Sequence, residues 1–202
     1  MHMDRRQFVK NLGLGTASLS MGSLVTASSC APSGDSSLKQ NVKEGEDGQF
    51  LFIGDDIAIA QTEYGKVQGY LLNHVYTFLG VPYGADTSGK NRFMPPQKPE
   101  PWADVRPAVF YGNTAPQRME NRWPNNYGTF ADHWNYWDVS EDCLYLNVWT
   151  PGIADGKKRP VLVWLHGGGF TNGSGIEQDG YHGENISREG DIVFCSINHR
   201  LG

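Results

Sequence analysis

The sequence of 202 residues contains few cysteines, no dense stretch of basic side chains and no long apolar run. Its three cysteines cannot form a disulfide framework. Lysine and arginine number 17 against 22 aspartate and glutamate residues, and the resulting net charge of −5 argues against a nucleic-acid-binding surface. The mean hydropathy of −0.48 excludes a protein with several membrane spans. The histidines have no metal-ligand spacing, and we expect neither a metal ion nor a cofactor.

The composition that is present points to a loop-rich domain. A chain of this length corresponds to one domain of ordinary size, with room for a hydrophobic core. Glycine (25), proline (11) and aromatic residues (12%) are abundant, which is typical of long loops held in place by large apolar side chains.

Residues 1–30 have the order of an export signal. A basic start containing Arg5 and Arg6 precedes a weakly apolar stretch over 12–25, which is followed by small residues and Cys30. The paired arginines resemble a twin-arginine signal, which implies the twin-arginine export machinery as a partner and a periplasmic or membrane-anchored location in a bacterium. Cys30 stands where a lipoprotein signal places its acylated cysteine, although Ala27 replaces the usual leucine. The alternative is a disordered N-terminus with a chance arginine pair.

Residues 31–48 are rich in Ser, Gly, Lys and Glu and contain almost nothing to bury. This composition predicts a flexible linker between the export signal and a domain over residues 49–202.

The first half of that domain predicts short strands followed by a long loop region. Segments 57–62 and 66–70 flank a Tyr-Gly turn and predict a hairpin, and 75–79 predicts a third strand. From 82 to 139 the chain has many prolines and no sustained periodicity, so we expect ordered loops there.

Three apolar segments follow, at 144–149, 161–165 and 192–197. The last two are almost continuously apolar, which predicts central strands buried on both faces of a mostly parallel sheet. Such a sheet needs helices on both faces and indicates an α/β fold.

Directly after the segment 161–165, the chain reads His166-Gly-Gly-Gly-Phe170. Consecutive glycines at the carboxyl end of a strand cost backbone entropy and add no packing. They suit a loop whose bare N–H groups approach a ligand, such as the oxyanion of an acyl-transfer intermediate. The alternative is a flexible glycine turn without a chemical role.

Several blocks of residues between about 58 and 202 occur in a recognisable order. They are Thr62, Gly65, Val67 and Gly69; Phe78 to Tyr83; Arg92-Phe93; Pro99, Pro101-Trp102 and Asp104-Val105; Ala115-Pro116-Gln117; Ser140 to Pro151; His166 to Phe170; and Asn198 to Gly202. Together they resemble the type-B carboxylesterases, a family that includes cholinesterases and para-nitrobenzyl esterases. The 140–151 block is specific to this family, whereas the glycine triplet alone would also fit hormone-sensitive-lipase-like esterases.

The resemblance implies an α/β-hydrolase fold, with the N-terminal part of its mixed central sheet in this chain. It assigns the N–H groups of Gly168 and Gly169 to the oxyanion hole of a carboxylic-ester hydrolase acting on a small-molecule ester. It also makes Arg92 and Glu141 a buried structural ion pair.

The resemblance further concerns the loop that precedes the 144–149 segment. Cys143 occupies the position that closes a disulfide in cholinesterases. Since 113–120 has no cysteine, we expect Cys143 to be a free buried thiol. Trp134 or Trp137 could contact the alcohol part of a substrate, with core packing as the alternative.

No serine of the sequence has glycine both two residues before and two residues after it, so the G-x-S-x-G nucleophile elbow is absent. We therefore expect an N-terminal portion, truncated before the nucleophile elbow and the rest of the Ser-His-acid triad. Such a chain should be catalytically inactive and should expose the sheet edge at 161–165.

Two other classes of function stay open at this point. One is a non-catalytic cholinesterase-like binding or adhesion protein at the cell surface. The other is a surface lipoprotein that binds sugars through the aromatic segment 123–137.

Overall fold

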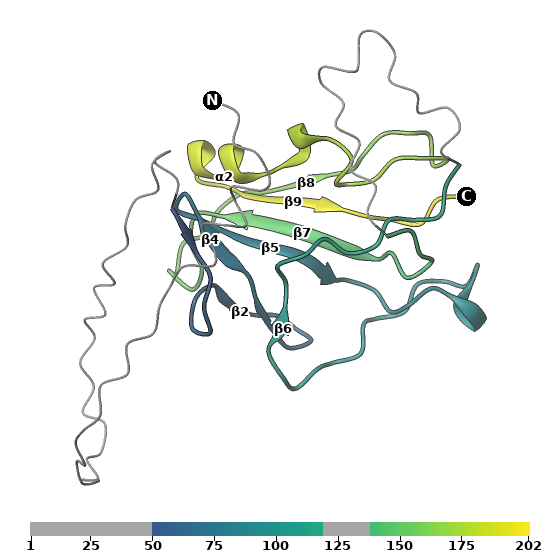
Figure 1. Cartoon of the computed structure of the whole chain (residues 1–202), viewed down its shortest axis with the longest axis horizontal. Helices are drawn as coiled ribbons and strands as arrows, with labels where there is room; N and C mark the ends of the chain where they lie inside the picture. The colour runs from purple at the N-terminus through teal and green to yellow at the C-terminus, as the bar shows by residue number, and fades with distance from the viewer. Residues whose placement is uncertain (1–49, 119–137) are drawn as a thin grey trace, which may run out of the picture. The chain divides into compact units, whose positions relative to one another are not determined.

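The computed structural model describes residues 50–118 and 138–202, which all belong to one unit of the chain, residues 42–202. A six-stranded mixed sheet forms its centre, with strand order β1-β4-β5-β7-β9-β8 (Figure 1). Its strands are β1 (Leu51–Phe52), β4 (Tyr70–Leu72), β5 (Val75–Pro82), β7 (Tyr145–Thr150), β8 (Val161–Trp164) and β9 (Val193–Ile197). All neighbouring strands are antiparallel except β8 and β9, so the prediction of a mostly parallel sheet is wrong for the described residues. The expected export signal, Cys30 and the linker lie outside the described residues.

The predicted hairpin is confirmed as part of a second, three-stranded sheet. Strands β2 (Ile59–Gln61) and β3 (Lys66–Gln68) pair antiparallel, and β3 pairs in parallel with β6 (Arg106–Pro107). Thr62 closes the hairpin because its N–H donates to the Gly65 carbonyl at 2.9 Å.

The core has two main parts, one on each face of the six-stranded sheet. Phe78 in β5 packs with Val67, which belongs to β3 of the small sheet, and with Ala108, which directly follows β6. The next residue along β5, Leu79, packs with Trp149 and Phe194. Because successive side chains of a strand point to opposite faces, β5 contributes to both clusters.

One helix covers part of a sheet face. The helix α2 (Glu184–Gly190) packs on β5, β7 and β9. Its buried Ser187 donates from Oγ to the Trp149 carbonyl of β7 at 3.0 Å. Short 3₁₀ turns occur at Gly89–Asn91 (η1) and Asp179–Tyr181 (η2). The described part of the loop region contains only η1 and the short strand β6, as predicted.

The burial predicted for the 161–165 segment is wrong. Residues 161–164 form a strand parallel to β9, but all four are exposed, with Val161 at 64% and Val163 at 54%. Strand β8 ends the six-stranded sheet, and no other described strand pairs with its outer edge. Strand β9, in contrast, lies between β7 and β8 and is largely buried. An apolar strand is buried only where another element covers it.

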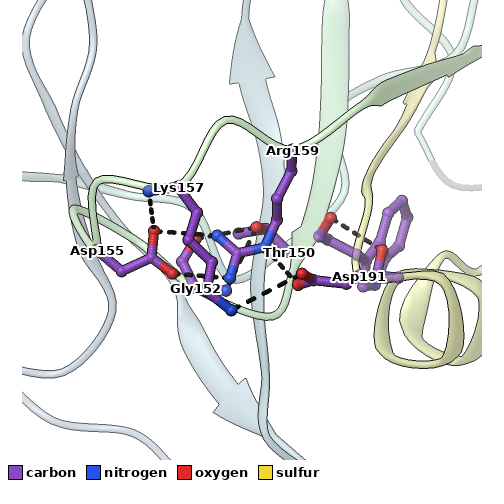
Figure 2. Close-up of polar contacts among 8 residues, drawn as sticks. Thr150, Gly152, Asp155, Lys157, Arg159 and Asp191 are labelled. Carbon is purple, nitrogen blue, oxygen red and sulfur yellow. Dashed lines mark hydrogen bonds and ion pairs between the residues drawn. The ribbon is translucent and has the colours of Figure 1, made fainter.

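An arginine whose side chain is largely covered fixes the start of the parallel pair β8–β9. The Arg159 side chain is 7% exposed and forms two hydrogen bonds to Asp155, at 3.0 and 2.7 Å. Its Nε donates to Asp191, the left-handed residue that ends α2, at 2.7 Å. Figure 2 shows Lys157 beside the same carboxylate, 3.8 Å from Asp191 Oδ2. These contacts lower the pKa of Asp155 to about 2, chiefly through the hydrogen bonds from Arg159.

Candidate active site

The glycine loop, which we define as residues 166–175, follows strand β8. Its tip over 167–170 is exposed, whereas His166 and residues 173–175 are buried. The tip is thus presented at the surface while both ends are anchored in the protein.

The backbone of the tip requires glycine. Gly168 has φ +116° and Gly169 has φ +61°, in the region that side-chain-bearing residues rarely adopt. A Cβ atom on Gly168 would lie 1.9 Å from the Asn172 carbonyl oxygen. Gly168 and Gly169 therefore serve a specific folded conformation rather than general flexibility.

The loop is a closed turn that leaves two amide groups available. The Gly168 carbonyl accepts from Thr171 N at 3.0 Å and from Asn172 N at 3.3 Å. The N–H groups of Gly168 and Gly169 donate to no acceptor within residues 50–118 and 138–202. Adjacent N–H groups on an exposed loop are suited to binding an anionic oxygen.

Two histidine rings support the start of the loop. The imidazoles of His166 and His199 stack with their centroids 4.3 Å apart and their planes 12° apart. Phe170, which has φ +60°, lies with its ring centroid 5.9 Å from His199. His199 follows β9, so the loop packs against the chain that leaves the neighbouring strand.

Amide side chains hold the buried end of the loop. Gly175 N donates to Asn198 Oδ1 at 2.8 Å, and Asn198 Nδ2 donates to the Asn113 carbonyl at 3.0 Å. Tyr83 donates from its hydroxyl to the Asn198 carbonyl at 2.7 Å, and burial raises the pKa of this phenol to about 12. In the sequence, Asn198 stands out only as part of a family block, because no local pattern shows which distant backbone groups an asparagine bonds.

A cleft of about 550 Å³ lies beside the loop and touches it at Phe170. Charged groups on its wall are Arg92, Glu141 and Arg200. Gly168 and Gly169 are not among the described residues that line it. The candidate oxyanion donors and this cleft are therefore separate features.

The predicted ion pair between Arg92 and Glu141 is present, but it is not buried. Arg92 Nε lies 2.6 Å from Glu141 Oε1 and Nη2 lies 2.7 Å from Oε2. The two side chains are 55% and 31% exposed, which corrects the expectation of burial. The reason is the open cleft, since both residues form part of its wall. The hydrogen bond from Arg92 to Glu141 raises the pKa of the guanidinium.

Cys143 is a buried free thiol, as predicted. It packs in one cluster with Ala115 and Leu144. Burial raises its pKa to about 11, and the nearby Asp142 carboxylate acts in the same direction. Because the thiolate is the reactive form, Cys143 is not a candidate nucleophile.

Ser174 is buried in the glycine loop, and its Oγ accepts from Ile176 N at 3.4 Å, so it does not sit at a strand-to-helix elbow. Trp134 and Trp137 lie outside the described residues. In residues 50–118 and 138–202, no group of three or more His, Cys, Asp or Glu side chains could hold a metal ion. No helix in the same part of the chain is both long and apolar enough to cross a membrane.

Comparison with known proteins finds a family match and relatives that cover most of the described residues. Residues 56–202 match the profile described as "Carboxylesterase family". Phenmedipham hydrolase of Pseudarthrobacter oxydans is 43% identical over 144 residues, and para-nitrobenzyl esterase of Bacillus subtilis is 38% identical over 147 residues. Each match covers 71% of this chain, which spans only 28% of the length of either relative.

Solved structures give the same result. An esterase from Clostridium hathewayi, described as hydrolysing aliphatic aromatic polyesters, matches with a TM-score of 0.67 and 38% identity. That match covers 76% of this chain and 29% of the esterase. Carboxylesterase EST55 of Geobacillus stearothermophilus matches with a TM-score of 0.60 and 37% identity, over 72% of this chain and 27% of its own. The fold is therefore part of an α/β-hydrolase fold, as expected.

Proposed function

The chain belongs to the carboxylesterase family, and from this premise we propose that it forms the N-terminal part of a carboxylic-ester hydrolase that supplies the oxyanion hole. The observation that carries the proposal is the glycine tip. Gly168 and Gly169 present two N–H groups that have no acceptor in the described part of the chain. A purely adhesive protein has no need for such a pair of donors.

The proposed chemistry is acyl transfer through a serine. The serine oxygen attacks the ester carbonyl while a histidine takes its proton, and the carbonyl oxygen gains the negative charge. The N–H groups of Gly168 and Gly169 would stabilise that oxyanion. Collapse expels the alcohol, which receives the proton, and water then releases the acid by the same steps. The serine, the histidine and the acid of the triad would come from sequence beyond residue 202.

The experiment is to extend the reading frame past Gly202 and to assay the complete gene product on para-nitrophenyl acetate, para-nitrobenzyl esters and phenmedipham. We expect a G-x-S-x-G motif and ester hydrolysis. A longer product without this motif, or without hydrolysis of any ester tested, contradicts the proposal. So does hydrolysis by the 202-residue chain well above a variant carrying His166→Ala and Ser174→Ala.

The three glycines provide a graded test of the oxyanion hole. A Cβ on Gly167 meets nothing within 4 Å and its φ is not positive, so Gly167→Ala should leave kcat close to the wild-type value. Gly169→Ala has space but a strained φ, and Gly168→Ala has neither space nor a favourable φ. Since one oxyanion donor contributes about 10²- to 10³-fold in kcat, we expect losses of this order for Gly168→Ala and smaller ones for Gly169→Ala. Equal effects of all three substitutions would overturn the assignment.

We also propose export of the chain through its first 30 residues. The support is the paired Arg5 and Arg6 ahead of a weakly apolar stretch. Replacing both arginines by lysine should retain the protein in the cytoplasm. Mass spectrometry of the exported protein decides whether Cys30 carries a lipid.

A further inference from the structure

The side-chain amide of Gln117 forms two hydrogen bonds with the backbone of Gly173, near the C-terminal end of the glycine loop. Its Nε2 donates to the Gly173 carbonyl at 3.0 Å, and Gly173 N donates to its Oε1 at 2.9 Å. The Nε2 group also donates to the Ala115 carbonyl at 3.2 Å. The half-buried side chain thus satisfies both backbone groups of one loop residue, in the manner of a neighbouring strand.

Gly173 is in direct contact with the start of the loop. Its φ is +111°, and a Cβ there would lie 2.4 Å from both the Gly167 carbonyl oxygen and His166 Nδ1. Between these ends, the Gly168 carbonyl accepts from the N–H groups of residues 171 and 172. The position of Gly173 therefore limits where the peptide groups of 167–169 can lie.

Asn198 has a different role from that of Gln117. It is 2% exposed and bonds both Gly175 and the Asn113 carbonyl, so it joins β9 to the segment at 113. Only Gly175, two residues further from the tip, receives its contact within the loop. Among the described side chains, Gln117 is the one outside the loop that hydrogen-bonds Gly173.

We infer that Gln117 is a positioning residue for the oxyanion hole: by fixing the peptide of Gly173, it fixes the direction of the Gly168 and Gly169 N–H groups. This inference rests on the proposed function. Gln117 itself touches no reacting atom. Its effect should fall on the transition state, because the oxyanion exists only there, and not on binding of the ground-state ester.

The test compares Gln117→Met, which keeps the length of the side chain and removes both hydrogen bonds, with Gln117→Glu, which keeps the acceptor for Gly173 N. Gln61→Met is the matched control, since the Gln61 amide bonds only the neighbouring Thr62 carbonyl in the described structure. The complete gene product is used, and active sites are counted by titration with an activated phosphonate, which phosphonylates the serine oxygen and releases its leaving group. We expect kcat per site to fall about 10- to 100-fold in Gln117→Met, with KM changed less than about threefold. Gln117→Glu should lie between Gln117→Met and the wild type.

A purely structural role would lower the number of titrated sites or the melting temperature and leave kcat per site unchanged, and that result overturns the inference. Amide hydrogen exchange over 166–175 gives a readout independent of catalysis. Faster exchange in Gln117→Met but not in Gln61→Met supports the contact with Gly173 even if the wild type hydrolyses no ester, in which case only the proposed function fails. Unchanged exchange together with unchanged kcat refutes the positioning role while the esterase assignment stands.

Discussion

Arg159 Nε donates to Asp191 Oδ1 at 2.7 Å, and this hydrogen bond joins the chain segments that lead into the parallel strands β8 and β9. Arg159 lies two residues before β8, with Pro160 between them, and Asp191 lies two residues before β9. The glycine loop is carried by β8, so the position of the loop depends on this attachment.

We expect Arg159→Met to lower the stability of the protein and to change its pH dependence. The folded-state pKa of Asp155 lies at about 2, below its usual value of 3.8, so its interaction with Arg159 contributes fully above about pH 4. That contribution is lost as the pH falls through about 2, when the carboxylate is protonated even in the folded state. Urea midpoints measured from about pH 7 to about pH 2.5 should therefore show a difference between wild type and variant that shrinks in acid.

Lys158→Met is the control, because Lys158 forms no ion pair within the described residues. It should leave the midpoint nearly unchanged across the same range. A difference for Arg159→Met that is constant with pH would show that the stabilisation does not come from the carboxylates.

Asn147 forms a buried polar link between β7 and its two neighbours. Its Oδ1 accepts from Gly80 N at 3.0 Å, and its Nδ2 donates to Ser196 Oγ at 3.1 Å. Asn147→Ala leaves the Gly80 N–H without an acceptor in the interior, so we expect a loss of about 1–3 kcal/mol in the free energy of unfolding. Chemical denaturation measures it. Asn91→Ala, on an exposed turn, should change stability by less than about 0.5 kcal/mol.

The strands were largely predictable from the sequence because apolar runs and turn residues mark them locally. The exposure of β8 was not predictable. Hydrophobicity shows which surface a strand would bury if another element covered it, but it does not show that such an element is present. The hydrogen bonds between Gln117 and Gly173 join residues that are 56 positions apart in the sequence. No short-range pattern contains it, and only the folded arrangement brings the two together. Likewise α2 has few apolar residues, and it forms where Ser187 bonds to β7.

Strand β8 should make the 202-residue chain self-associate. Val161 and Val163 share one face of the strand and are 64% and 54% exposed, and the outer edge has no partner among the described strands. Replacing both valines by lysine should shift sedimentation profiles from concentration-dependent oligomers towards monomer. The control is Val105→Lys, an exposed valine outside the described strands, which should leave association unchanged. A wild-type chain that stays monomeric at high concentration would contradict the prediction.

Ala115 lies in the same buried cluster as Cys143 and should accept an engineered disulfide. Thr114 and Val139 pair as a bridge, which brings the chain segments that carry Ala115 and Cys143 together. Ala115→Cys under oxidising conditions should lower the mass by two hydrogens and remove the free thiol of Cys143. Closing this loop should raise the free energy of unfolding by roughly 2–4 kcal/mol, and the gain should disappear on reduction. Ala108→Cys is the control, since Ala108 is equally buried but belongs to a different cluster and should leave Cys143 unpaired. If Ala115→Cys keeps both thiols free under the same oxidation, the two side chains do not approach within bonding geometry.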